Sequence, residues 1–279
     1  MRRSEWISVV AAVFLMVLPA SVVGQSQEPG IDSGPGDLGG HLSVVVPQGA
    51  APVGTTISVA TRDPSERPDE LRTTPMNLAF YELQPADLRF SAPVTVTRSI
   101  GFQELGIEQF DPVFDGLVVG SLFTRDADGA WTWLQDAAVR LDAADAAFTV
   151  TGTTDHGGPI MVYVPGDLLV ATEDAAPTPV GQVFRVEGQL RVDATSRAAI
   201  AAVSGHTSDA TIAKAGSSYD VASFDRAEGL EFECLTPGTV QYETTFSISD
   251  VADVSPLHGA IGLGPTVVAV TQTGEHTCQ

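Results

Sequence analysis

The sequence predicts an all-β protein with two β-sandwich domains in tandem after a cleaved signal peptide. An N-terminal apolar run of export type opens the chain, and many short segments of alternating apolar and polar residues follow it, separated by Gly and Pro turns. An acidic Pro/Ala-rich stretch divides these segments into two groups. Short strand patterns between turn signals, without a long helical period, are typical of β-sandwiches.

The first 24 residues have the features of a signal peptide. Arg2 and Arg3 give a positive start, and an almost purely apolar run over residues 7–18 follows them. The alternative is a retained membrane anchor, but the run is shorter than the ~20 apolar residues that span a bilayer. Small residues then allow cleavage after Gly24 or, as a second choice, after Ala20. We therefore expect a secreted or cell-envelope, extracytoplasmic protein without membrane insertion after cleavage.

The chain is strongly acidic. It has 35 Asp and Glu against 14 Lys and Arg, a formal net charge of −21, and removal of residues 1–24 makes the charge one unit more negative. Such a surface repels phosphate backbones and anionic lipids, which argues against nucleic acid or a membrane surface as the partner. The expected partner is therefore a protein or a glycan at a surface, and its identity is unknown.

Changes in composition predict the domain boundaries. Residues 25–40 are rich in Gly and poor in apolar residues, which predicts a flexible leader. Residues 173–179 form the acidic Pro/Ala stretch, which is typical of a semi-extended linker. The expected domains are therefore 41–172 and 180–279, each within the usual size range of one domain.

The first domain is expected to contain about nine short strands. Asp128 and Gly129 lie between two of them and predict a hairpin, because Gly tolerates the positive φ of such a turn. The predicted strands are 42–46, 55–60, 78–83, 94–97, 117–123, 130–134, 138–141, 148–151 and 160–164.

The second domain shows a similar, less regular pattern. Strands are predicted at 183–192, 230–234, 240–246 and 266–271, while the periodicity of 194–203 fits a short helix as well as a strand. Its two cysteines, Cys234 and Cys278, predict one disulfide closing a loop of about 45 residues. Their spacing, even with His276 nearby, fits no zinc pattern.

Three stretches resemble one family. Residues 43–55 read SVVVPQGAAPVGT, residues 81–94 read YELQPADLRFSAPV, and Trp131 is followed by Asp155 and His156. This order is similar to ZU-five-type domains, and the resemblance covers about 45–165. It implies a β-sandwich of the kind found in ankyrins, netrin receptors and many bacterial exported proteins. Residues 180–279 loosely resemble bacterial immunoglobulin-like domains in their strand pattern and disulfide.

The sequence departs from that family at two places. Ala86 and Asp87 follow Pro85, where the family usually has a Gly after the Pro. Some relatives cut their own backbone at His-Phe-Ser, whereas this chain has His156, Gly157 and Gly158 without a hydroxyl nucleophile. The resemblance therefore implies no self-cleavage here.

The acid–base candidates favour structural roles. Asp155 and His156 are adjacent, and neighbouring residues of a strand point to opposite faces, so we expect Asp155 not to orient His156. Residues 204–209 contain Ser, His and Asp, but one short polar loop rarely forms a triad, and a surface loop is expected. No catalytic residue and no enzyme activity are predicted.

No metal or cofactor is predicted. Residues 126–129 resemble a fragment of a calcium loop but lack its further oxygen ligands, and the hairpin explains them equally well. Calcium at other acidic positions stays possible without a supporting motif. The Gly-rich residues 259–264 have no strand–helix context for binding phosphate.

Aromatic residues mark two further candidates. Loop 99–116 contains Phe102, Phe110 and Phe114 among acidic residues, which makes it a possible binding loop. The alternative is that these rings cap the core. Trp131 and Trp133 share one side of a predicted strand, and this side is either core or a carbohydrate platform.

These observations favour an exported, non-enzymatic binding or structural module of the cell surface or extracellular space. The alternative is a secreted hydrolase or a carbohydrate-binding accessory protein that uses acidic loops. That alternative requires Asp155, His156 and the carboxylates of loop 99–116 to converge in one cleft.

Overall fold

The computed structural model describes residues 30–32, 42–66, 69, 80–105, 116–126, 128–142, 145–164, 167–192, 198–249, 261–263 and 266–279. The predicted all-β sandwich fold is confirmed, since strands make up nearly all regular structure in these ranges. Two short 3-10 turns, η1 (Pro64–Glu66) and η3 (Phe102–Leu105), interrupt them. The described residues include no helix with the length and apolarity of a membrane span. The signal peptide stays a prediction, because 1–29 lie outside the described residues.

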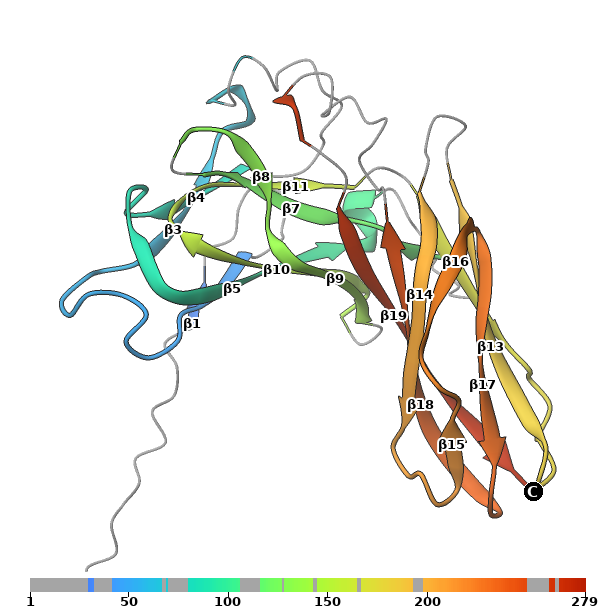
Figure 1. Ribbon diagram of the computed structural model, residues 1–279. Coiled ribbons are helices and arrows are strands. Elements are labelled where there is room, and N and C mark those ends of the chain that lie inside the picture. The colour runs from blue at the N-terminus through green and yellow to red at the C-terminus, as the bar shows by residue number, and fades with distance from the viewer. Residues whose placement is uncertain are drawn as a thin grey trace, which may run out of the picture.

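One nine-stranded sheet, here called the long sheet, runs through both halves of the molecule (Figure 1). Its neighbours are antiparallel except β9 and β19, which pair in parallel over three residues and join the two halves. In spatial order the strands are β1 (Gly30–Asp32), β2 (Leu42–Val45), β5 (Arg89–Gly101), β10 (Ala147–His156), β9 (Gln135–Asp142), β19 (Val267–Cys278), β18 (Gly238–Ser249), β14 (Ala199–Thr207) and β16 (Tyr219–Asp225).

Two five-stranded sheets complete the sandwiches. The first small sheet consists of β3 (Ser58–Arg62), β4 (Phe80–Gln84), β11 (Gly158–Tyr163), β7 (Ser121–Arg125) and β8 (Trp131–Trp133). The second small sheet consists of β15 (Ala213–Ala215), β17 (Ala227–Cys234), β13 (Val183–Arg191), β12 (Leu168–Glu173) and β6 (Leu117–Val118).

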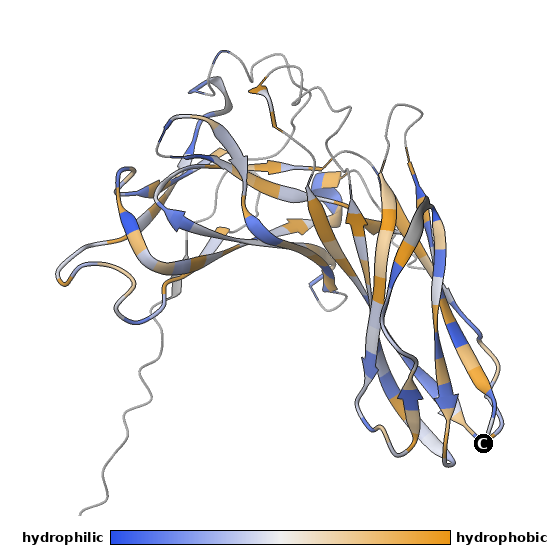
Figure 2. Ribbon diagram, in the orientation of Figure 1, coloured by the Kyte–Doolittle hydropathy of each residue, from blue (hydrophilic) through white to orange (hydrophobic). Residues whose placement is uncertain are grey.

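The core lies on one face of the long sheet in both halves. Five buried residues stand side by side across its central strands, in the order Val150, Val139, Val270, Phe246 and Val203. Cross-strand partners point to the same face, so both small sheets cover this face. No strand among the described residues covers the opposite face, here called the free face. Figure 2 shows apolar and polar residues alternating along these strands.

A smaller apolar cluster covers the outer face of the first small sheet. It contains Phe80, Phe123, Met161 and Tyr163 from β4, β7 and β11, together with Leu263 from the connection between β18 and β19. The second half therefore also contacts the first half away from the long sheet.

The two sandwiches are interleaved more than the composition indicates. β12 lies in the segment assigned to the first domain, except for Glu173, the first residue of the expected linker 173–179. It nevertheless pairs along its whole length with β13. β6, also from the first segment, pairs with β12. The Pro/Ala stretch thus marks the connection between two neighbouring strands of one sheet. Likewise, Gly30–Asp32 of the expected flexible leader pairs with β2 as β1.

The ambiguous segment 194–203 is a strand where it is described. β14 begins at Ala199 and continues to Thr207, so residues 204–207 of the expected surface loop belong to this strand. Its alternation was obscured by small side chains, and a register shift between Ile200 and Ala202 further breaks the period.

Candidate functional site

Asp155 and His156 interact directly, and the expectation that they point apart is wrong. His156 Nδ1 lies 2.7 Å from Asp155 Oδ1, and His156 Nε2 lies 2.7 Å from the carbonyl oxygen of Arg125. The pairing of β10 with β5 shifts register between Thr154 and His156. A bulge of this kind breaks the alternation of side chains, which lets neighbouring residues meet.

This geometry gives His156 a bridging role. Both ring nitrogens lie within hydrogen-bond distance of protein oxygens, which ties the imidazole to Asp155 and to the backbone of Arg125. The contact with Arg125 joins β10 of the long sheet to β7 of the first small sheet. The hydrogen bond from His156 lowers the pKa of Asp155, with a smaller contribution from Arg89, whose Nη1 lies 3.6 Å away.

Two hollows of about 340 and 360 Å³ flank His156, and both are also lined by Arg89 and Asp126. The larger hollow includes Gly157 and Gly158, the positions of the missing self-cleavage motif. A side chain at Gly157 would collide with the carbonyl oxygen of Pro85, so this position requires glycine here. At this turn, Gly157 is therefore required by packing, and Gly157 and Gly158 supply no hydroxyl group.

Replacing His156 with alanine is expected to lower the free energy of unfolding by about 1–3 kcal/mol, because a buried hydrogen-bonding group and its bridge are lost. The matched control is His206→Ala on β14, whose side chain is exposed, with an expected change within about 0.5 kcal/mol. Urea unfolding followed by tryptophan fluorescence measures both. Equal effects of the two substitutions would contradict the bridging role.

The acidic loop does not join this site in its described part. Glu104 lies 2.6 Å from Nη2 of Arg98, at the far end of β5 from Arg89. The strand rise places these two arginines about 30 Å apart along β5. Phe102 packs against Phe148 with ring centroids 5.2 Å apart, as a ring capping the core would. Phe110 and Phe114 lie outside the described residues.

The two tryptophans belong to the apolar cluster on the first small sheet. Trp131 and Trp133 both contact Phe123 edge to face, at centroid distances of 5.4 and 5.6 Å. The guanidinium carbon of Arg125 lies over the Trp131 ring, 4.8 Å from the ring centroid. Both rings are partly buried, which supports the core interpretation over a carbohydrate platform.

The remaining short motifs form turns. Asp126 Oδ1 accepts hydrogen bonds from the backbone of Asp128 and Ala130, each at 2.9 Å, and Gly129 has a φ of +82°. The predicted hairpin is confirmed. No three His, Cys, Asp or Glu side chains gather in a metal-binding arrangement in the described ranges. Of the Gly-rich stretch 259–264, only 261–263 are described.

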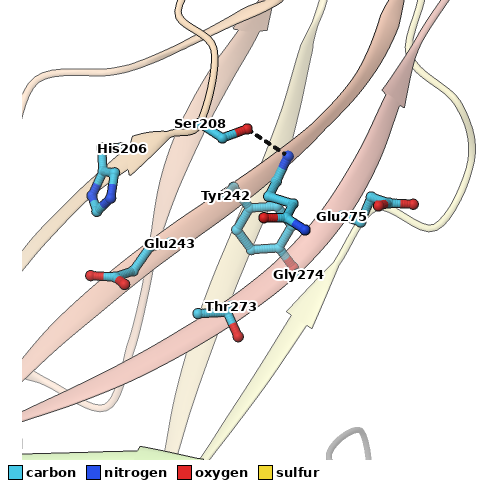
Figure 3. A pocket seen from close by; sticks show the side chains of 8 residues that line it. His206, Ser208, Tyr242, Glu243, Thr273, Gly274 and Glu275 are labelled. Atoms are coloured by element: carbon cyan, nitrogen blue, oxygen red, sulfur yellow. Dashed lines mark hydrogen bonds between the residues drawn. The ribbon is translucent and has the colours of Figure 1, made fainter.

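A hollow of about 560 Å³ lies on the outer side of β14, β18 and β19 (Figure 3). His206, Glu243 and Thr273 form one cross-strand row on this surface. Gln241 and Glu275 form the next row, where the backbone of Gln241 donates to Ser208 Oγ at 3.2 Å. No sequence pattern indicates this hollow, because its residues meet only through strand pairing.

The predicted disulfide is confirmed. Cys234 and Cys278 are bonded, with Cα atoms 5.6 Å apart. The expected linker runs beside this bond, since Thr178 pairs with Cys278 and Gly181 donates to the carbonyl of Cys234. His276 lies nearby, stacked on Phe184 at 3.8 Å.

His276 makes stability depend on pH. Burial lowers the pKa of this imidazole in the folded chain, although the carboxylates of Glu173 and Asp174 oppose the shift. The unfolded chain therefore binds the proton first as the pH falls below about 6.5, and the folded state loses stability from there down to the lowered pKa. His276→Phe is expected to flatten the pH dependence of the melting temperature in this window. An unchanged slope would contradict it.

Known proteins show little similarity to this chain. No family model matches the chain, and no curated protein matches it. A crystal structure of the S-layer protein SbsC, domains 4 and 5, is similar over 77% of this chain and 96% of that chain, with 11% sequence identity and a TM-score of 0.21. A likeness at this level assigns no function, so the candidate site depends on the chain's own residues.

Proposed function

We propose that this protein is an exported, non-enzymatic module of the cell surface or extracellular space that binds or spaces through the faces of its sandwiches. The disulfide is the observation that carries this proposal. Cys234 and Cys278 are both buried and bonded, and structural disulfides persist in oxidising, extracytoplasmic compartments.

The architecture supports a spacing or binding role. A single long sheet crosses both halves, and the connection between β18 and β19 contacts the first small sheet. The alternative hydrolase has less support, because His156 has both nitrogens engaged and Glu104 pairs with Arg98 far along β5.

Export can be tested directly. The full chain is expressed in a bacterium with a periplasm, and the extracytoplasmic fraction is treated with a thiol-alkylating reagent without reductant. Mass spectrometry is expected to show a chain that begins at Gln25 and carries no alkylated cysteine. A cytoplasmic chain with free thiols would contradict the proposal, as would turnover of a glycan or peptide ester by the purified protein.

A further inference from the structure

The free face of the long sheet, opposite the core, carries small uncharged residues across both halves. Strand pairing aligns one row over seven strands from β2 to β14. All its members are partly exposed, and they are, in order, Ser43, Thr97, Thr151, Ala138, Ala269, Ser247 and Ala202. At a strand spacing of about 4.8 Å, this row is about 29 Å long.

The neighbouring row likewise consists of Ser and Thr apart from one arginine, although its Thr271 is buried. It consists of Ser99, Thr149, Arg140, Thr271, Thr245 and Ser204. Arg140 is its one charged member, and Glu243 neutralises it through two contacts of 3.0 and 3.3 Å. On a chain with a formal net charge of −21, the centre of the free face is therefore neutral.

Hydroxyl groups on this face have capacity for further hydrogen bonds. Thr245 and Thr271 share one at 3.1 Å, and Thr151 reaches the carbonyl of Ala138 at 3.4 Å. The hydroxyls of Thr97 and Thr149 have no protein partner within the described part of the chain. An occupant rich in hydroxyl groups can pair with such donors and acceptors directly or through water.

The hollow of Figure 3 extends the same face. Thr245 is followed outward on β18 by Glu243 and Gln241, which line the hollow together with Thr273 and Glu275 of β19. Its volume of about 560 Å³ lies within the about 300–1,000 Å³ typical of small-molecule sites. The neutral rows therefore lead into a polar hollow with carboxylate and amide groups.

The shape of the sheet and the residues on it restrict the occupant. The long sheet bends where β9 meets β19, with both small sheets on its outer side and the free face inside the bend (Figure 1). Two such concave faces from two copies cannot meet along their length. Protein partners are usually anchored by aromatic or arginine residues, and the two rows contain only the paired Arg140. Anionic polymers are repelled by the net charge.

We propose that the free face binds an uncharged polysaccharide chain, which lies across the strands from β2 to β14 and ends in the hollow of Figure 3. This inference depends on the proposed extracytoplasmic location, where such polymers occur. Hydrogen bonds to Thr and Ser hydroxyls hold the sugar hydroxyls along the rows, while Gln241, Glu243 and Glu275 bind them in the hollow. With no aromatic platform, binding is spread over many weak contacts.

Cosedimentation of the purified full chain with insoluble cellulose, chitin and β-1,3-glucan, and with alginate gel as an anionic control, tests this proposal. We expect retention on at least one of the first three and none on alginate. Retention on an uncharged matrix is expected to change little between about 0.1 and 1 M salt.

Thr151→Glu places a charge at the centre of the free face. It is expected to weaken retention about tenfold, because an unpaired carboxylate must be desolvated against the sugar. Ser247→Glu tests the other half in the same way, and Thr172→Glu, on the exposed side of β12, is the control without effect. Circular dichroism confirms folding of each variant.

Several outcomes would overturn the inference. These are no retention of the wild-type chain on any of the three polysaccharides, equal retention of the row variants and Thr172→Glu, or a mass in solution that shows a dimer lost in Thr151→Glu. Because the assay uses purified folded protein, its failure leaves the export result untouched, and failure of export leaves this result untouched.

Discussion

Replacing Glu104 with alanine is expected to lower the free energy of unfolding by about 3–5 kcal/mol, which is typical of breaking a buried ion pair. The side chain of Arg98 is fully buried on β5, and Glu104 neutralises it at 2.6 Å with only 12% of its own side chain exposed. Without Glu104, a guanidinium would remain in the core beside Tyr81, whose ring centroid lies 5.8 Å away. Glu104 Oε1 also accepts from the backbone of Gly101 at 3.1 Å, so the start of η3 loses its cap.

The matched control is Glu82→Ala, which removes the partner of Arg62. That pair is 22% and 38% exposed, and its loss is expected to cost less than about 1 kcal/mol. Joint replacement by Arg98→Met and Glu104→Leu should recover most of the stability, because it removes both charges from the core. Urea unfolding measures all three, and a loss at Glu104 no larger than at Glu82 would contradict the role of the buried pair.

Strands with a regular alternation could be predicted from the sequence. The segment predicted at 183–192 is β13 over Val183–Arg191, and its residues alternate between exposed and buried without exception. β5 shows the limit of this method, since 94–97 was predicted and the strand runs from Arg89 to Gly101. The buried Arg98 occupies a core position of β5, and a charged residue there hides the pattern.

The division into two sandwiches was visible, but the way they connect was not. Pairing of β9 with β19 joins residues more than 100 positions apart over only three pairs. β12 resembles the end of the first domain in sequence and becomes a strand of the second small sheet. Short pairings of this kind leave no periodic signal, because they are fixed by packing after each strand has formed.

The same reason explains why the candidate sites could not be predicted. The contact of His156 with Asp155 depends on a bulge after Thr154, and no residue type at this position predicts the bulge. Alternation alone predicts that Thr97 and Thr151 face outward, yet only strand register places them beside each other and in line with Ser247. The free face consists of residues that are common in strands, so only the strand register reveals its rows. The disulfide, in contrast, could be predicted from the two cysteines alone.

Removing that disulfide through Cys234→Ala with Cys278→Ala is expected to lower the free energy of unfolding by about 4 kcal/mol. The bond joins residues separated by 44 positions, and a loop of this length restricts the unfolded chain by about that amount on the chain-entropy estimate. Both cysteines are buried, so the small alanine side chains fit their sites. Guanidinium unfolding with and without reductant measures the effect.

The wild-type chain in reductant is the control, and it should match the double variant, which reductant should leave unchanged. Loss of the disulfide should first loosen the structure near the bond. Thr178 pairs with Cys278, and Gly181 and Gln182 bond to Cys234, so the segment between β12 and β13 is held between the two bonded strand ends. Hydrogen exchange is expected to rise there before it rises in β5 or β10. Uniform exchange across both halves would instead show that the interleaved sheets unfold as one unit, with the disulfide acting on all of them.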